Sequence, residues 1–451
     1  MNNSLLKARN VVSTPAIERT VIAVLAMVLM LGQFVTPACA GEGDIPITGE
    51  PTPGLEAIDE AIVQFMQNNG LPGGALAVAR EETINGRTEV RLVLVHGYGF
   101  WDKDRSLVTQ PNTRFRIASI SKPLTATAIL KLINQRKLGL HDFVVDVLPE
   151  FKDAAEKVDW RIGLITVYDL LTHQGGWDDA KIGFDPMFMA VHNGLVTRPG
   201  TDEDITKYML TRQLDYSPGM EQHYSNFGYA VLGRIIERVS GVTYQTYVRE
   251  NITGPLEMTG TGLGGTLKGD RLPFEAIYYD YPGAPLIDSV FDQFRLVPWP
   301  YGGFYMPAFQ ASGGWVSTTT DQLRYLVSMT TGDHAIIRLP TLLQPRDDQF
   351  VGYDVPPFDK PWLRGRWWSW YKAGDMPGTT AALRIIQSKS DPKHPRTFWY
   401  FLSNTRPALP VRQPNWDYFF NDLDAKMTAA IRSVSQEDHW PAGHNLWWFN
   451  H

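Results

Sequence analysis

The 451-residue chain contains one cysteine, Cys39, and several familiar functional patterns are missing from it as well. A single cysteine cannot form an internal disulfide or a cysteine-based metal site, so the stability of the fold must come from its core. The ten histidines show no H-E-x-x-H or similar ligand spacing, and we expect no metal and no other cofactor. The net charge is −6 without any run of Lys and Arg, so nucleic acid is not an expected partner.

Two glycine-containing motifs also argue against particular enzyme classes. No G-x-S-x-G occurs, which counts against an α/β-hydrolase nucleophile turn. The stretch Gly260–Gly265 fits G-x-G-x-x-G, but no strand precedes it and no helix follows it. We therefore expect a glycine-rich loop there and not a dinucleotide site.

The N-terminus differs in composition from the rest of the chain. Basic residues precede the apolar run "VIAVLAMVLMLGQFV", and the small-x-small end Ala38-Cys39-Ala40 follows it. This order is typical of a secretory signal peptide, which we place at residues 1–40. It predicts an exported protein, periplasmic or secreted, with no stable membrane span after cleavage. The alternative is an uncleaved signal that anchors the protein in the membrane.

The remaining chain divides into a Gly- and Pro-rich lead-in at 41–55, one domain at 56–435 and a tail at 436–451. Strand-like runs occur near both ends of the domain, and helical periodicity dominates from about 130 to 300. We predict an α/β (α+β) fold in which an antiparallel sheet, built from both ends of the domain, is flanked by helices and carries a mostly helical insertion. Oligomeric state cannot be read from this pattern.

The stretch "FRIASISKPLTATAILKLINQRKLGL" contains a candidate nucleophile, Ser119. Lys122 lies three residues later, on the same face of a helix, whereas Ser121 points elsewhere. Pro123 is tolerated only in a first helical turn, so it places the helix start at these residues. Free backbone N–H groups at that position favour an oxyanion, and a nearby lysine can take the serine proton. On its own, Ser119 could equally be a helix N-cap.

Two further motifs supply partners for this serine. Tyr224-Ser225-Asn226 stands at the mouth of a predicted helix, and Lys372-Ala373-Gly374 stands before the turn Pro377-Gly378. A tyrosine serves as a base if neighbouring ammonium groups lower its pKa. Gly374 would let a strand edge come close to a substrate.

Together, S-x-x-K, Y-S-N and K-x-G resemble the class C β-lactamase and penicillin-binding-protein-like serine hydrolase family. The flanking segments "LLTHQGGW", "YSPGMEQHYSNFGYAVLG" and "ASGGWVSTTTDQLRYL" are similar to that family's pattern, and the resemblance covers about 57 to 405. It implies a β-lactamase/transpeptidase-like fold.

The resemblance also implies roles for individual residues. Ser119 would be acylated, and Lys122 and Tyr224 would share the general-base work. The implied substrate-binding residues are Asn226 on the acyl side, Lys372 and Gly374 in the pocket wall, and Asp375, whose backbone N–H would form the oxyanion hole with that of Ser119. His173 and His223 are expected to have structural roles instead.

The substrate is less defined than the reaction. The aromatic-rich loop before "ASGG" suits an apolar acyl group, which favours a small-molecule ester or amide. Lys372 could pair with a carboxylate, so a β-lactamase or a D,D-carboxypeptidase acting on penicillin or peptidoglycan peptides is the alternative. A non-catalytic cell-wall binding homologue is a third reading. The tryptophans Trp440, Trp447 and Trp448 receive no function.

Overall fold

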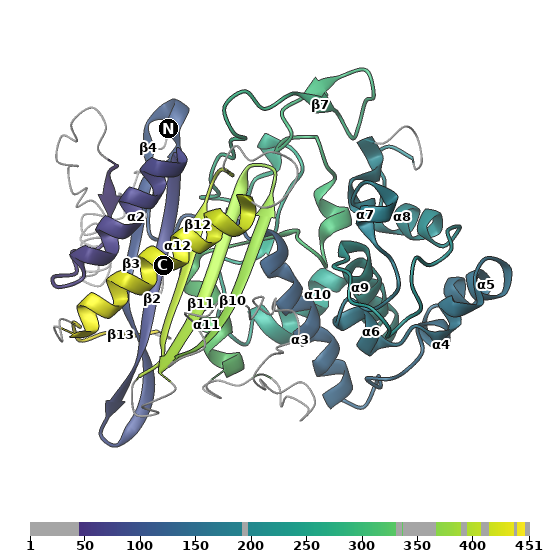
Figure 1. Ribbon diagram of the computed structural model, residues 1–451, viewed down its shortest axis with the longest axis horizontal. Helices are drawn as coiled ribbons and strands as arrows, with labels where there is room; N and C mark the ends of the chain where they lie inside the picture. The colour runs from purple at the N-terminus through teal and green to yellow at the C-terminus, as the bar shows by residue number, and fades with distance from the viewer. Residues whose placement is uncertain are drawn as a thin grey trace, which may run out of the picture. The chain divides into compact units, whose positions relative to one another are not determined.

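An antiparallel sheet is assembled from both ends of the chain, as predicted (Figure 1). The computed structural model describes residues 45–191, 197–330, 336, 367–388, 395–406, 415–436 and 440–446, and the account below concerns the unit that begins at Ile47. The predicted signal peptide lies outside the described residues. Across the sheet the strands are ordered β1 (Ile47–Thr48), β3 (Arg87–Asp102), β2 (Gly73–Ile84), β12 (Thr397–Ser403), β11 (Thr379–Ser388) and β10 (Trp367–Met376).

Two hairpins set the register of this sheet. Asn85 and Gly86 join β2 to β3 with φ angles of 51° and 77°, the left-handed pair that a tight hairpin turn requires. Pro377 and Gly378 join β10 to β11, and Gly378 has a φ of 83°. Among the strands that the structure describes, β10 pairs with β11 alone, so it forms one edge of the sheet.

Helices cover the sheet on both faces. α2 (Glu56–Asn69) and α12 (Asn415–Gln436) lie together over one face (Figure 1), where Phe65 is 4.9 Å from Phe419 and 5.9 Å from Phe401, measured between ring centroids. α11 (Thr319–Thr330) lies against the strands of the other face. Because both faces are covered, β12 is buried at every position from Thr397 to Ser403.

A helical region follows the first two long strands. Its helices are α3 (Ser121–Asn134), α4 (Val144–Val147), α5 (Pro149–Lys157), α6 (Val167–Leu171), α7 (Asp179–Ile182), α8 (Asp202–Met209), α9 (Asn226–Ser240) and α10 (Tyr244–Val248). α3 and α9 pack against each other, and apolar residues of both belong to the same core as the inner face of the sheet. The helical region is therefore continuous with the sheet and shares its core.

The region from 254 to 309 contains short strands and turns, in a part of the chain where the sequence predicted long loops between helices. β6 (Gly262–Leu263) joins β5 (Phe115–Arg116) and β9 (Trp315–Ser317) in a small sheet, which agrees with the expected glycine-rich loop. β7 (Ile287–Asp288) and β8 (Leu296–Val297) form a separate hairpin. This part of the chain is rich in proline, which interrupts helical hydrogen bonding.

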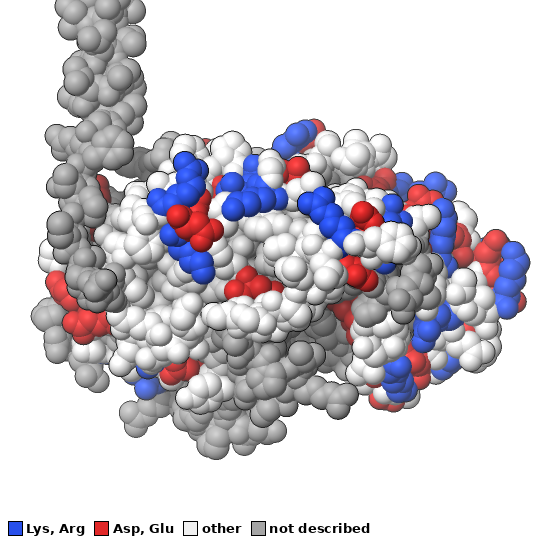
Figure 2. Space-filling model, turned by 90° about the horizontal axis from the view of Figure 1, so that it is seen from above, with Lys and Arg blue, Asp and Glu red and all other residues white. Residues whose placement is uncertain are grey.

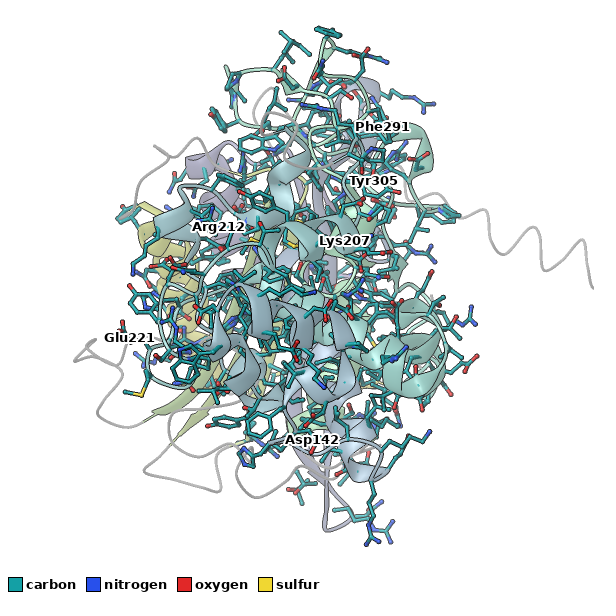
Figure 3. All side chains as sticks on the ribbon, turned by 90° about the vertical axis from the view of Figure 1, so that its right-hand side faces the viewer. Asp142, Lys207, Arg212, Glu221, Phe291 and Tyr305 are labelled. Atoms are coloured by element: carbon teal, nitrogen blue, oxygen red, sulfur yellow. The ribbon has the colours of Figure 1, made fainter. Side chains whose placement is uncertain are left out.

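Aromatic side chains hold this proline-rich region together. Phe291 and Tyr305 lie beside each other near the β7–β8 hairpin (Figure 3), with ring centroids 6.2 Å apart and the rings perpendicular. Phe188 packs edge-to-face on Phe304 and Phe309 at 5.8 and 4.8 Å. The loop from 298 to 309 is thus attached to the segment that follows α7.

Short strands occur in both segments that flank the predicted domain. β1 lies inside the predicted flexible lead-in and pairs with β3. β13 (His444–Asn445) lies in the tail and also pairs with β3, while Trp440 is contacted by the Arg80 guanidinium 4.9 Å from its ring centroid. Trp447 and Trp448 lie outside the described residues. Over the part of the chain that the structure describes, no helix is long and apolar enough to cross a membrane.

Candidate active site

Ser119 lies at a sharp bend just before α3. The helix begins at Ser121, and Ser119 belongs to the preceding 3-10 turn, Ala118–Ile120, which corrects the expectation that the helix itself opens at Ser119. Ala118 has a φ of 47°, a left-handed conformation that costs energy in a residue with a Cβ. Pro123 stands in the first turn of α3, where its missing N–H removes no helical hydrogen bond.

Ser121 faces away from Ser119, as predicted. Its Oγ accepts the Trp315 N–H at 3.2 Å, and the side chain is fully buried. Ser121 therefore attaches the start of α3 to β9.

Lys122 is completely buried beside Ser119, and its ammonium group has three neighbours. Nζ donates to Ser119 Oγ at 3.2 Å, to Asn226 Oδ1 at 2.6 Å and to the Ser312 carbonyl at 2.8 Å. A lysine has three donors, so these contacts satisfy all of them. The spacing that suggested one shared helical face therefore places the lysine within reach of the serine.

Tyr224 approaches Ser119 from the segment before α9. Its Oη lies 2.7 Å from Ser119 Oγ, and 42% of the side chain is exposed. The ammonium groups of Lys122 and Lys372 lie 4.8 and 5.7 Å from its ring centroid. Positive charge at this distance stabilises the negative charge of a phenolate.

Asn226 is held at the N-terminus of α9. Ser225 caps this helix by accepting the Gly228 N–H at 3.1 Å, so the next side chain, Asn226, starts the first turn. Asn226 Oδ1 faces Lys122, and Asn226 Nδ2 donates to Asp185 Oδ2 at 2.5 Å. The structure thus brings Ser119, Lys122 and Asn226 into one hydrogen-bonded group.

His173 supports the tyrosine from behind. Its ring centroid is 4.6 Å from that of Tyr224, and its Nδ1 accepts the Ser225 N–H at 3.2 Å. Burial, reinforced by the charges of Lys122 and Lys372, lowers the pKa of His173 well below its usual value. A neutral imidazole is required for Nδ1 to accept that hydrogen bond.

His223 is directed elsewhere, although it precedes Tyr224 in sequence. It stacks on Tyr216 with ring centroids 4.1 Å apart, and its Nδ1 lies 3.4 Å from Asp178. Figure 3 shows Glu221, which contacts the other ring nitrogen of His223 at 3.3 Å, at the periphery of that view. The histidine therefore ties the loop before Tyr224 to α7.

The edge strand β10 forms the opposite wall and comes very close to Ser119. A Cβ added to Gly374 would lie 2.5 Å from the Ile117 carbonyl and 3.1 Å from the Ser119 nitrogen. The glycine is therefore required by the contact between β10 and the serine turn, a reason different from the substrate approach that the sequence suggested. Lys372 is buried on the same strand and faces Tyr224.

Asp375 follows Gly374 on this wall and carries an unusual carboxyl group. Its Oδ1 is buried and has no hydrogen-bond partner among the described residues. Burial raises the pKa of Asp375 to about 7, against the opposing charge of Arg406 and with a further raising effect of Asp280. Because side chains alternate along a strand and Lys372 and Gly374 face the serine turn, the Asp375 carboxyl group points to the opposite face of β10, and only the backbone of Asp375 is close to Ser119.

Two further carboxyl groups lie near Lys122, one of them hydrogen-bonded to Asn226, and sequence reasoning missed both. Asp185, in the segment between α7 and the 3-10 helix Pro186–Val191, has its pKa raised by burial. Burial, with the charges of Asp185 and Asp178, raises the pKa of Asp179 to about 8. The only sequence signal is the Asp-Pro pair in "GFDPMF", typical of a turn, and it does not indicate proximity to Asn226.

The geometry brings together all seven residues that the sequence singled out, from α3, α9 and β10. A hydroxyl with two bases in hydrogen-bond reach, next to a strand edge, is an arrangement for nucleophilic attack on a carbonyl. Among the residues that the structure describes, no group of His, Cys, Asp and Glu side chains is arranged to hold a metal ion.

Comparison with known proteins places the chain among such enzymes. Protein flp of Staphylococcus aureus (strain N315) is 29% identical over 234 residues, which make up 52% of this chain and 43% of that protein. The chain therefore matches less than half the length of this curated relative.

Two solved structures share the fold. The D-amino acid amidase from Ochrobactrum anthropi SV3 complexed with D-phenylalanine has a TM-score of 0.62 and 20% identity, covering 84% of this chain and 99% of its own. EstCE1, a hydrolase with promiscuous acyltransferase activity, has a TM-score of 0.58 and 19% identity, covering 84% and 98%. The family model "Beta-lactamase" matches residues 58–420. The chain accordingly belongs to the Beta-lactamase family of serine hydrolases.

Proposed function

We propose that this protein is an exported serine hydrolase that cleaves carboxylic esters or amides through an acyl-enzyme on Ser119. The observation that carries the proposal is the position of Ser119 Oγ, 2.7 Å from Tyr224 Oη and 3.2 Å from Lys122 Nζ. A neutral Lys122 amine and an ionised Tyr224 phenolate can each accept a proton. A serine hydroxyl is a weak nucleophile until such a base removes its proton.

The reaction follows from these positions in two steps. Tyr224 and Lys122 share removal of the Ser119 proton, and Oγ attacks the substrate carbonyl. The resulting oxyanion accepts hydrogen bonds from the backbone N–H groups of Ser119 and Asp375. The proton taken from Ser119 then passes to the departing alcohol or amine. Water, activated by the same bases, then attacks the acyl-enzyme and regenerates Ser119.

A carboxyl group beside Asn226 supports a neutral or cationic acyl side of the substrate. Asp185 Oδ2 accepts a hydrogen bond from Asn226 Nδ2 at 2.5 Å. Ionised, this group repels a substrate carboxylate next to Asn226. The likeness to a D-amino acid amidase agrees with amide cleavage. On the face of the protein seen in Figure 2, basic and acidic side chains lie close together.

A β-lactamase or D,D-carboxypeptidase is the second candidate, and Lys372 is the observation in its favour. Its buried ammonium lies beside Tyr224 on the strand wall, where it could attract a carboxylate. The two candidates differ in whether the pocket binds a substrate carboxylate.

One set of labelling experiments tests the proposal. The full-length chain is treated with a fluorophosphonate and its intact mass is measured. The wild type and Ser119→Ala are compared, with Ser121→Ala as the matched control. We expect one adduct on the wild type and on Ser121→Ala, and none on Ser119→Ala. An adduct that survives Ser119→Ala would overturn the nucleophile assignment, and an unlabelled wild type would favour the non-catalytic homologue.

Substrate class is tested on the same samples. We expect turnover of p-nitrophenyl butyrate or D-phenylalanine amide and an unchanged mass after brief exposure to benzylpenicillin. A penicilloyl adduct or released penicilloate would favour the second candidate. Export is part of the proposal and rests on the N-terminal pattern. We expect the protein recovered from the cell exterior or periplasm to begin at Gly41.

A further inference from the structure

We propose that Asp185 is a positioning residue for this reaction, acting through Asn226 to aim Lys122 at Ser119. The inference rests on the proposed function and adds a residue to it. Asp185 lies outside the three motifs and touches Asn226 on the side away from Lys122.

The contacts of Asp185 favour its carboxylate form. Its Oδ1 accepts the Met187 N–H at 2.9 Å, and its Oδ2 accepts Asn226 Nδ2 at 2.5 Å. A backbone N–H and an amide NH₂ can only donate, so both oxygens act as acceptors here. Burial raises the pKa of Asp185, whereas these two hydrogen bonds and the charge of Lys122 oppose that rise.

This carboxylate fixes which way the Asn226 amide points. With Nδ2 on Asp185, Oδ1 faces Lys122 Nζ at 2.6 Å. The reversed amide would place its oxygen against the carboxylate and its NH₂ against the ammonium, and both contacts would be repulsive. Asp185 therefore selects one of two orientations that have nearly the same shape.

The chosen orientation determines where Lys122 directs its reactive electron pair. A neutral lysine keeps two N–H donors, which match two acceptors, Asn226 Oδ1 and the Ser312 carbonyl. Its lone pair is then left for the third neighbour, Ser119 Oγ. If the amide were reversed, its NH₂ would compete for that lone pair, and Lys122 would be a poorer base for Ser119.

Local sequence explains why Asp185 can hold this position. Gly183 ends α7 with a φ of 88°, and Pro186 opens the following 3-10 helix. The proline favours an extended backbone at Asp185, from which the carboxylate reaches the Met187 N–H. Among the described residues, the other titratable or charged groups around Lys122 are Tyr224, Tyr229, Lys372, His173 and Asp179.

The test measures the rate of Ser119 acylation by a fluorophosphonate as a function of pH. Asp185→Asn offers one oxygen to two donors, so the Asn226 amide can reverse. We expect its maximal rate to fall about 10- to 100-fold, part of the 10²–10⁴ that a positioned base contributes. We also expect the acidic limb of the profile to move to lower pH, because the loss of a negative charge disfavours protonated Lys122. If the variant only lost folded protein, the amount of labelled protein would fall, but the acidic limb of the pH–rate profile would not move.

Two variants separate this contact from a general change of charge or stability. Asp178→Asn removes a charge from the same segment but not a partner of Asn226, and we expect it to label at the wild-type maximal rate. Asp185→Glu keeps the carboxylate, and we expect the wild-type limb position with a rate between the wild type and Asp185→Asn, which remains measurable if Asp185→Asn does not fold.

The outcomes distinguish this inference from the proposed function. A labelled wild type together with a wild-type profile for Asp185→Asn would overturn the role of Asp185 and leave the hydrolase intact. A limb that moves equally in Asp185→Glu, or a rate loss that is equal in Asp178→Asn, would also overturn it. An unlabelled wild type would instead overturn the proposed function itself.

Discussion

The two walls of the candidate active site are built on different principles. The helical wall, from α3 and α9, carries Ser119, Lys122 and Asn226, and each of these side chains has the hydrogen-bond partners described above. The strand wall, from β10, contributes the buried Lys372 and the backbone of Gly374, which lies against the serine turn. The helical wall is therefore held by hydrogen bonds between side chains, and the strand wall by close packing of backbone on backbone. The comparison teaches that the reacting groups are positioned by the helical wall and that the space beside them is set by the strand wall.

The difference has a source in the fold. α3 and α9 pack against each other inside the shared core, so their side chains have little freedom. β10 is an edge strand whose outer backbone groups are not used by the ladder. An edge of this kind is where an extended substrate can add its own hydrogen bonds.

The helical wall is tested most severely by Tyr224→Phe, which removes the hydroxyl 2.7 Å from Ser119 and leaves the ring in place. We expect kcat/KM for p-nitrophenyl butyrate to fall by about 10³, within the 10²–10⁴ range of general-base catalysis. Tyr216→Phe, in the same loop, is the matched control and should stay close to wild type. If Tyr224→Phe kept more than a tenth of the activity, reactivity could not be assigned to this wall.

The contact between the walls is tested by Gly374→Ala. The new Cβ would lie 2.5 Å from the Ile117 carbonyl, so either β10 or the serine turn must move. We expect kcat/KM to fall about 100-fold, the effect of a displacement of roughly 1 Å at a reacting group. Gly269→Ala is the control, because open space surrounds that position. Thermal melts measured alongside would show whether the loss follows from unfolding, and unchanged activity would mean that the walls need not touch so closely.

The smallest effect on activity is expected for Asp375→Asn on the strand wall. Its side chain points to the face of β10 opposite Lys372 and Gly374, so the substitution leaves the backbone of the proposed oxyanion hole in place. We expect kcat/KM for p-nitrophenyl butyrate and for a carboxylate-bearing ester to stay close to wild type. A change that differs between the two substrates would show that the carboxyl group acts on the bound substrate.

The same variant has a pH-dependent effect on stability. The folded chain raises the pKa of Asp375 to about 7, so between about pH 4 and 7 the folded state binds more protons than the unfolded state. Wild-type stability therefore falls as pH rises through that range, and Asp375→Asn should not show this fall. The difference in Tm should be small at pH 4 and reach its full size, in favour of the variant, by pH 8.

Much of the fold was predictable because its signals are local. Asn85-Gly86 specified a hairpin, Gly241 ended α9, and the apolar runs near 397–403 specified a buried strand. The region from 254 to 309 was not predictable in the same way. Its short strands depend on pairing with distant residues such as Trp315, which leaves no periodic pattern in the sequence.

The residues of the candidate site also differ in whether a local sequence pattern could identify them. Ser119, Lys122 and Tyr224 could be selected because their motifs combine chemistry with a recognisable spacing. Asp185 could not, because its role depends on where the segment after α7 folds back onto α9. The sequence also suggested that Gly374 makes room for a substrate, whereas the room is occupied by the Ile117 carbonyl and the Ser119 nitrogen.

The strand order has a consequence for how the enzyme comes into being. β2 is synthesised early and pairs with β12, more than 300 residues later, so the sheet closes only when nearly the whole domain is available. Pairings of such long sequence separation slow folding, because the loop must close before the contact is gained. Lys372 and the backbone of Asp375 also arrive late in synthesis. A ribosome-bound chain that has already made Ser119, Lys122 and Tyr224 therefore still lacks the strand wall, and the complete site forms only at the end of synthesis.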